Sequence, residues 1–374
     1  MKKIIADVVN FPNDCETVRF TACFVSMLMR AEGMTNENCD FFCSEQKGDC
    51  VRCGKCGDFV PIHKRHSELY NLYTAVTGFG FLQIDLSDDE HMREDWNQTC
   101  NVMLRYFDWY IGFAMDYAGY EFEEWIFPLD EKDRVFQRIR ASIDKDIPVL
   151  ALFGEKYQWV LVTGYDDDGA LYGLDGSQSY WGKPLVEPAG YDEKGLFIIP
   201  DWYEKRGHAF VLGARKERSV SLQDVFRRGI KIMESMKEKN YYHNSADFMR
   251  NDAVFDGLND EALLKMRDRI SRWIGQPIDQ RAMLGYAMNP LRMGEEQNKE
   301  AVAFHSVHHY CWTSHDALWI AWRGIGEYMD GDRLDWAKGL RNKTIRRMIA
   351  DCFQMVCDHD DYMLDALREA FSDE

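Results

Sequence analysis

The sequence lacks any run of 18 consecutive apolar residues, so it predicts no membrane-spanning helix. It also lacks a basic excess, because 45 Lys and Arg stand against 63 Asp and Glu, a formal net charge of −18. A surface this acidic repels the phosphates of nucleic acids and anionic membranes, so we expect neither as a partner. Internal repeats and low-complexity stretches are absent too. With 46% hydrophobic residues, the composition excludes a disordered chain.

The N-terminus has few features of a signal peptide. It begins with two lysines after Met1, but Asp7 follows closely and no long apolar core is present. Cysteine, in contrast, is abundant, with 11 in the chain. Without an export signal, this content favours a reducing compartment and metal binding over disulfides. We therefore expect a cytoplasmic protein.

Residues 39–56 hold the densest group of cysteines, and His63 and His66 follow it. The group consists of Cys39, Cys43, Cys50, Cys53 and Cys56. Two-residue spacers let neighbouring thiolates reach one ion. Because five thiols and two imidazoles exceed the four ligands of a structural zinc, the sequence predicts zinc without selecting its ligands.

The hydrophobic pattern changes near residue 217. Before it, helical patterns at 21–31 and 134–145 accompany short apolar strands at 148–153, 159–165, 170–175, 195–199 and 209–213. Such strands, joined by tight turns, predict an α+β domain with an antiparallel sheet. After it the pattern is helical, beginning with a capping box at Ser221 and Asp224. We predict two domains, 1–217 with an irregular insert at 39–66, and 218–374.

The first predicted helix offers two candidate nucleophiles. A thiol in the first turn of a helix is stabilised as thiolate by the helix dipole and by free backbone N–H groups. If Thr21 caps this helix, Cys23 occupies the first turn. If the helix begins earlier, Cys15 takes that position instead.

Several segments together resemble the papain-like fold. They are the helix after Cys15 or Cys23, the strand PVLALF, the hairpin WVLVTGYDDDGALYGLDG and the closing segment DWYEKRGHAFVLG. The chain is most similar to the N-terminal domain of butirosin biosynthesis protein H and to related domains found alone or fused to bacterial transcription regulators. The resemblance covers residues 8–217, and residues 218–374 resemble the helical region that follows those domains.

The resemblance implies a cysteine at the helix start, a histidine at the start of WVLVTGYD, and Asp or Asn on the next strand. Asp175 matches the third position, but the second falls on Gln158 or Trp159. A carboxamide does not accept a proton from a thiol, so the usual route loses a base that contributes roughly 10²–10⁴-fold. His208 begins a similar strand and is a substitute base, although it matches the last strand of the family.

The long helix predicted at 295–322 carries a further candidate site. One stripe of this helix holds Phe304, His308, Cys311, His315, Leu318 and Trp322. Ligand pockets often lie between domains, so we interpret His308, His315, Trp312 and Trp319 as possible pocket residues.

The sequence thus predicts a catalytically degenerate papain-like protein that binds a small molecule or peptide in a cleft between its domains. The alternative is a cysteine-dependent hydrolase or acyltransferase that acts on a peptide or thioester.

Overall fold

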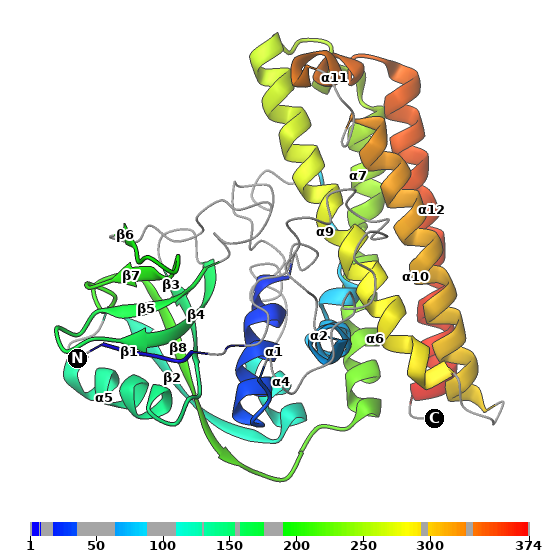
Figure 1. The fold of residues 1–374 in the computed structure, drawn as a ribbon. Helices are drawn as coiled ribbons and strands as arrows, with labels where there is room; N and C mark the ends of the chain where they lie inside the picture. The colour runs from blue at the N-terminus through cyan, green and yellow to red at the C-terminus, as the bar shows by residue number, and fades with distance from the viewer. Residues whose placement is uncertain are drawn as a thin grey trace, which may run out of the picture. The chain divides into compact units, whose positions relative to one another are not determined.

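The computed structural model describes residues 2–6, 8, 18–35, 64–87, 110–128, 131–153, 158–175, 190–292, 298–326 and 332–372. The chain divides into two compact units. The α+β unit contains Met1–Tyr73 and Ile111–Ser219, and the helical unit contains Thr74–Tyr110 and Val220–Glu374 (Figure 1). The chain enters the helical unit for the last time after Ser219, two residues beyond the predicted boundary at 217. Residues 74–110, which we expected in the first domain, also group with the helical unit.

The α+β unit is built around an antiparallel sheet, as predicted. Its strands are β1 (Lys3–Ile4), β2 (Tyr120–Phe127), β3 (Val149–Phe153), β4 (Gln158–Tyr165), β5 (Leu171–Leu174), β6 (Gly190–Tyr191), β7 (Phe197–Ile199) and β8 (Gly207–Arg215). The order across the sheet is β2-β8-β3-β4-β5-β7-β6, and β1 pairs with β4. Its helices are α1 (Arg19–Ala31), α2 (Lys64–Val76, whose last three residues belong to the helical unit), α4 (Tyr110–Ala118, whose first residue does) and α5 (Lys132–Ile143).

Alternate residues of the strands face opposite sides of the sheet. On one side, Val149, Ala151 and Phe153 of β3 share a core with Val135 and Ile139 of α5. The other side of β3 and β4 packs against α1, most of which is buried. The sheet is therefore covered on both faces, and the α1 side carries the predicted catalytic positions.

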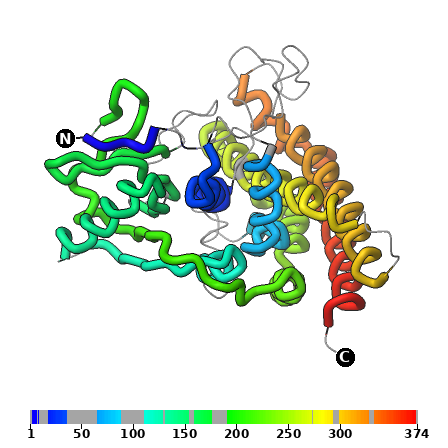
Figure 2. Tube along the Cα trace, turned by 60° about the horizontal axis from the view of Figure 1, so that its bottom comes forward, coloured from blue at the N-terminus to red at the C-terminus, as the bar shows by residue number. Residues whose placement is uncertain are grey.

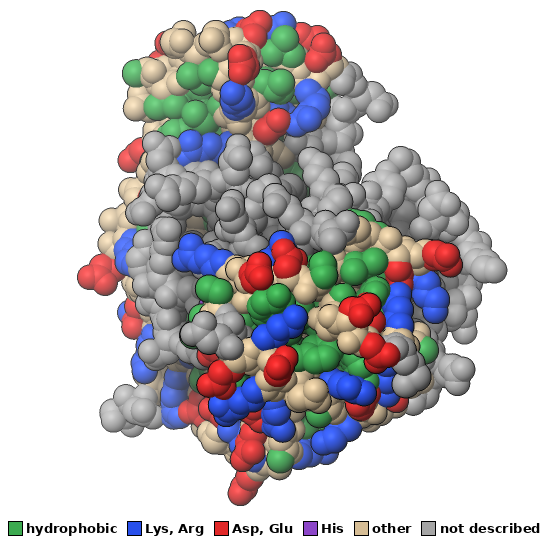
Figure 3. Space-filling view, turned by 90° about the vertical axis from the view of Figure 1, so that its left-hand side faces the viewer, with side chains coloured by type: hydrophobic (Ala, Val, Ile, Leu, Met, Phe, Trp, Pro, Cys, Tyr) green, Lys and Arg blue, Asp and Glu red, His purple; other side chains and the backbone are tan. Residues whose placement is uncertain are grey.

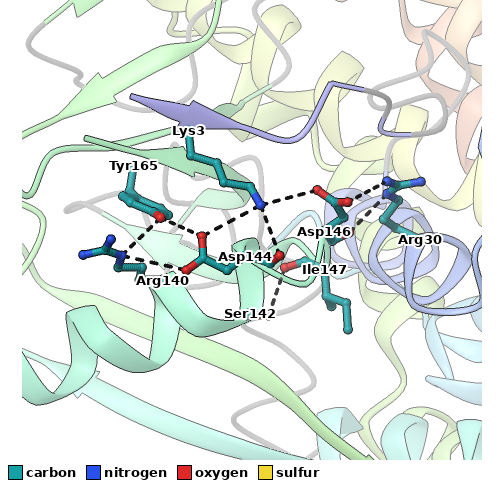
Figure 4. A network of polar contacts seen from close by, with 8 residues as sticks. All are labelled: Lys3, Arg30, Arg140, Ser142, Asp144, Asp146, Ile147 and Tyr165. Atoms are coloured by element: carbon teal, nitrogen blue, oxygen red, sulfur yellow. Dashed lines mark hydrogen bonds and ion pairs between the residues drawn. The ribbon is translucent and has the colours of Figure 1, made fainter. Parts of the chain in front are cut away.

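A polar network surrounds the turn between α5 and β3 (Figure 4). Lys3 Nζ donates to the backbone oxygen of Asp144 at 3.1 Å, and Tyr165 Oη donates to its carboxylate at 2.6 Å. Arg30, in the last turn of α1, donates through Nε to the backbone oxygen of Asp146 at 3.1 Å. The turn thus links β1, α1 and β4 to the end of α5.

Charges of both signs are mixed on the surface. On the face shown in Figure 3, acidic and basic side chains lie interspersed, with small apolar areas between them. Among the described residues, exposed ion pairs such as Arg138–Glu123, Arg215–Glu32 and Lys2–Asp192 also place opposite charges side by side. The net charge of −18 is therefore not gathered into one acidic patch on this face.

After the last three residues of α2, the helical unit continues with the 3₁₀ turn η2 (Phe79–Phe81). Its helices are α6 (Leu222–Lys239), α7 (Tyr241–Arg250), α8 (Asp252–Phe255), α9 (Asp260–Arg292), α10 (Lys299–Gly324), α11 (Arg333–Gly339) and α12 (Lys343–Phe371). The capping box at Ser221 and Asp224 is confirmed at the start of α6. Helices α9, α10 and α12 are long, and α10 packs against both others (Figure 2). No described helix has the length and apolar character needed to cross a bilayer.

The buried face of α10 differs in part from the predicted stripe. Phe304, Cys311 and Leu318 are buried as expected, but Val307, Ser314 and Ala321 complete the buried face. His308, His315 and Trp322 are only partly buried. Close packing against α9 contributes to this difference, since a Cβ atom at Gly285 would lie 3.2 Å from Nε1 of Trp312 and 3.3 Å from Cβ of Cys311. The small side chains of Ser314 and Ala321 suit such a close approach and are buried.

Candidate functional site

The start of α1 differs from the sequence prediction. Val18, not Thr21, is the N-cap residue, and no side chain caps the helix. The helix begins two residues earlier than predicted because Thr21 takes helical geometry instead of capping. Cys23 is therefore the fifth residue of α1 and fully buried. It has neither the first-turn position nor the solvent access that activates a thiol. Cys15, the alternative, lies outside the described residues.

The position expected to hold the catalytic histidine lies at the start of β4. Gln158 is the first residue of this strand and pairs with Phe153 of β3, but its side chain lies outside the described atoms. Trp159 is 1% exposed, and its ring centroid lies 5.0 Å from that of Phe20 of α1 and 5.7 Å from that of Phe210 of β8. The indole therefore fills the space between the sheet and the N-terminal turn of α1.

The substitute base, His208, lies on the same face of the sheet as Trp159. Leu152 of β3 is in register with both residues, so their backbones are two strand spacings apart, roughly 10 Å. Nδ1 of His208 lies 2.8 Å from Oε1 of Glu124 on β2, and its ring is parallel to that of Phe210. The imidazole is thus engaged with a carboxylate at the β2 side of the sheet.

Asp175 directly follows β5, on the other side of β4 from β3. The residue is 1% exposed, and its Oδ2 accepts a hydrogen bond of 2.6 Å from Oη of Tyr191. A buried carboxylate needs such a donor, because an unpaired one is costly to desolvate. The geometry fits a structural role at least as well as the orienting role that the resemblance implies.

A buried serine–histidine pair that joins α1 to α2 was not predicted. Oγ of Ser26 lies 3.0 Å from Nε2 of His66 on α2, and both residues are fully buried. Ser26 is one turn after Cys23, so the two side chains lie on neighbouring parts of one helix face. From its place in the sequence, His66 was expected only as a companion of the cysteine group. The two residues are 40 positions apart, so no local sequence pattern could have predicted their contact.

The predicted zinc ligands lie outside the described residues. This holds for Cys39, Cys43, Cys50, Cys53 and Cys56, and for His63. Within the described ranges, no group of three or more His, Cys, Asp or Glu side chains is arranged to hold a metal ion. Zinc therefore stays a prediction from the sequence.

The predicted ligand residues of α10 form a row of ring contacts. Centroids of Trp312 and His315 are 5.2 Å apart, and Nε1 of Trp319 donates to Nε2 of His315 at 2.8 Å. An indole nitrogen only donates, so Nε2 of His315 accepts and its proton is on Nδ1, 3.1 Å from Asp316. Nδ1 of His308 lies 2.9 Å from the backbone oxygen of Gly285, and burial lowers the pKa of His308. Their role in a ligand pocket stays a prediction.

Comparisons with known protein families, curated proteins and solved structures identify no relative of this chain. No family model, curated protein or solved structure matches this chain. The resemblance to the papain-like fold therefore stays a prediction, while the α+β class with an antiparallel sheet and a helical C-terminal region is observed directly.

Proposed function

We propose that the α+β unit is a papain-like module without catalytic activity that binds a small molecule or a peptide. The observation that carries this proposal is Trp159, which occupies the start of β4 where an active member of that fold would present its base. An indole has no proton-accepting nitrogen. The burial of Cys23 in the second turn of α1 supports the same conclusion, because a buried thiol is not accessible to a substrate.

The environment of His208 also supports an inactive site. A general base must lie within hydrogen-bond reach of the proton it removes. The nitrogen Nδ1 of His208 is already paired with Glu124, two strands away from Trp159. This pair holds the imidazole toward the edge strand β2 and away from the start of β4.

The indole of Trp159 also supports ligand binding. Its Nε1 is buried and has no hydrogen-bond acceptor among the described residues. An unsatisfied buried donor costs about 1–3 kcal/mol, which a ligand acceptor would recover if the side chains around the indole moved apart to admit it. A carbonyl or carboxylate of a peptide or small molecule supplies that acceptor, and the rings of Phe20 and Phe210 supply apolar contact beside it.

The test is a thermal-shift screen of short peptides and small carboxylates with the full chain. The Trp159→Phe variant keeps the aromatic packing and removes only the N–H donor. We expect ligands that raise the melting temperature of the wild type to raise that of the variant less. A wild type that responds to no ligand, or a variant that responds equally, would reject the proposal.

The alternative of a cysteine-dependent hydrolase or acyltransferase is favoured by one observation. The pair of Ser26 and His66 places an imidazole one helical turn from Cys23. If this imidazole activates the thiol, one equivalent of iodoacetamide will label Cys23 at pH 6, and His66→Gln will abolish the labelling. Peptide mapping of the labelled protein separates this result from reaction at other cysteines.

The cysteines support a reducing compartment and a zinc site as further parts of this proposal. Among the described cysteines, Cys311, Cys352 and Cys357 are free thiols, which suits a reducing cytoplasm. The cysteine group of residues 39–56 is proposed to hold zinc. Metal analysis of the purified protein, with Cys50→Ser and Cys53→Ser as paired variants, tests the zinc site directly.

A further inference from the structure

Exposed apolar side chains are concentrated on two helices of the helical unit. Among the described residues, seven large apolar side chains are exposed, and five of them belong to α10 and α12. Single exposed apolar residues are ordinary on a protein surface, whereas a contiguous group marks an interaction surface. On α12 these residues are Met348, Met355 and Tyr362, at intervals of seven. Seven residues make nearly two helical turns, so the three side chains form one row of about 21 Å along α12.

This apolar row lies beside α10 (Figure 1). At one end of the row, the rings of Tyr362 and Tyr310 of α10 are stacked, with centroids 5.2 Å apart. At the other end, a Cβ atom at Gly324 of α10 would lie 2.5 Å from Cε of Met348. Ile320 is 53% exposed and lies one turn before Gly324 on the same face of α10. The two helices thus share an apolar surface, the α10–α12 seam, which consists of Tyr310, Ile320, Met348, Met355 and Tyr362.

Carboxylates border the seam on both helices. Asp351, Asp358 and Asp365 are also seven residues apart, and each comes three residues after a member of the apolar row. Because residues three apart are neighbours on a helix surface, this acidic row runs alongside the apolar row. On α10, Asp316 comes four residues before Ile320, and its side chain is 75% exposed. The seam therefore has negative charge along both of its borders.

The carboxylates of the acidic row remain able to bind a cation. The side chains of Asp351 and Asp365 are 72% and 75% exposed. The partners of the row among the described residues each contact Oδ1, and they are Arg250 for Asp351, Gln354 for Asp358 and Arg368 for Asp365. Such exposed contacts are weak. A carboxylate has about four acceptor sites on its two oxygens, so Oδ2 of each aspartate can still accept from an ammonium or guanidinium group.

We propose that the α10–α12 seam docks an amphipathic helix of another protein whose apolar row is flanked by Lys or Arg. The apolar row of that helix packs over Met348, Met355 and Tyr362, and its basic residues pair with the carboxylates on both borders. The thioethers of the two methionines adapt to the side chains that they meet. The net charge of −18 favours a basic partner as well.

A second copy of this chain fits the seam less well. Two copies of α12 in contact would bring their acidic rows together, and like charges at an interface oppose binding. The seam belongs to the helical unit alone, so the proposal does not depend on the proposed function of the α+β unit.

The experiment uses the full chain with ¹³C-labelled methionine methyl groups. The probe is the acetylated and amidated peptide (Leu-Ala-Ala-Leu-Lys-Ala-Lys)₃, a helix with an apolar row flanked by lysines. Met355 reports from the centre of the seam, and its signal is assigned with Met355→Leu. The buried residues Met27 of α1 and Met288 of α9 serve as internal controls. We expect a saturable shift of the Met355 signal with a Kd of about 10 μM in 50 mM NaCl, and weaker binding at higher salt.

Variants of the peptide and of the protein give the decisive comparison. Peptides with Glu in place of Lys, or with Ala in place of Leu, should each bind at least about ten-fold more weakly. A triple variant that neutralises the acidic row should weaken binding about ten-fold, because it removes three ion pairs with the peptide. It combines Asp351→Asn, Asp358→Asn and Asp365→Asn. The matched control changes the net charge equally at exposed sites of other elements and should bind as the wild type does, and it combines Asp133→Asn, Asp168→Asn and Glu261→Gln.

Three results would overturn the proposal. The first is a Met355 signal that does not shift at 1 mM peptide. The second is an equal loss of affinity in the two triple variants, or equal binding of the peptide without leucines, since either would show attraction by overall charge alone. The third is a Met355 signal that shifts with protein concentration in the absence of peptide, which would identify a second copy of the chain as the occupant of the seam.

Discussion

Arg281 of α9 and Asp360 of α12 form a buried ion pair, with Nη2 of the arginine 2.8 Å from Oδ2 of the aspartate. Gln83 donates to the same oxygen at 2.8 Å, and Nη1 of Arg281 donates to the backbone oxygen of Gly80 at 2.8 Å. The pair therefore joins α9, α12 and the segment around η2. Gly80 permits this arrangement, since a Cβ there would lie 2.8 Å from Cβ of Leu284.

Removing one member of this pair should be strongly destabilising. Arg281→Met leaves the carboxylate of Asp360 buried without its cation, and such a loss typically costs about 3–5 kcal/mol. Urea unfolding followed by far-ultraviolet circular dichroism measures the change. Lys265→Met is the matched control, because it breaks the exposed pair with Glu261 and should cost less than about 0.5 kcal/mol. A cost for Arg281→Met below about 1 kcal/mol would contradict the prediction.

His359 should make stability fall as the pH is lowered. Its Nδ1 lies 3.2 Å from the hydroxyls of Thr313 and Ser314, and burial lowers its pKa. The unfolded chain takes up this proton near pH 6.5. The contribution of His359 is therefore present above that pH and is lost as the pH falls through the lower pKa of the folded state.

Asp360 changes the stability with pH in the direction opposite to that of His359. Burial raises the pKa of Asp360 to about 6, so its contribution is full below its unfolded value and is lost as the pH rises through 6. Comparing the wild type with His359→Gln cancels this term, because both proteins keep Asp360. We expect the melting temperature of His359→Gln to fall less between pH 7.5 and 5.5. Parallel curves for the two proteins would show that His359 does not contribute.

Asp146 has a left-handed backbone, with φ of 57°. Its carboxylate lies 3.9 Å from Nζ of Lys3 and 3.6 Å from Nη2 of Arg30, but these ion pairs are partly solvated and contribute little (Figure 4). The backbone therefore decides the effect of substitution. Asp146→Ala should be less stable than Asp146→Gly by about 1 kcal/mol, because a Cβ is disfavoured at positive φ. Urea midpoints of the two variants test this order.

The local parts of the fold could be predicted because the sequence shows them directly. The strands at 148–153 and 159–165 and the capping box at Ser221 are observed close to where the residue pattern placed them. Strand β2 was not predicted. Its two central acids, Glu123 and Glu124, interrupt the apolar alternation, and its register is set by pairing with β8 alone.

The contacts that define the candidate sites depend on tertiary packing. Ser26 and His66 are 40 residues apart, and Arg281 and Asp360 are 79 apart. In both pairs, the sequence around one residue does not indicate which distant residue is its partner. The predicted start of α1 was wrong for a different reason. Threonine is a favoured N-cap residue, but Thr21 lies inside a helix that begins two residues earlier, at Arg19.

The buried thiols of the helical unit should resist alkylation. Burial raises the pKa of Cys311 and Cys357 to about 12 and that of Cys352 to about 11. The thiolate is the reactive form, so at pH 7.5 these thiols should react at least about 100-fold more slowly than a free cysteine. Iodoacetamide treatment of the native protein, followed by peptide mapping, should leave all three unmodified, and treatment in 6 M guanidinium should modify them fully. Rapid native labelling of Cys311, whose Sγ lies 3.6 Å from Sδ of Met363 in the core, would show that α10 and α12 separate in solution.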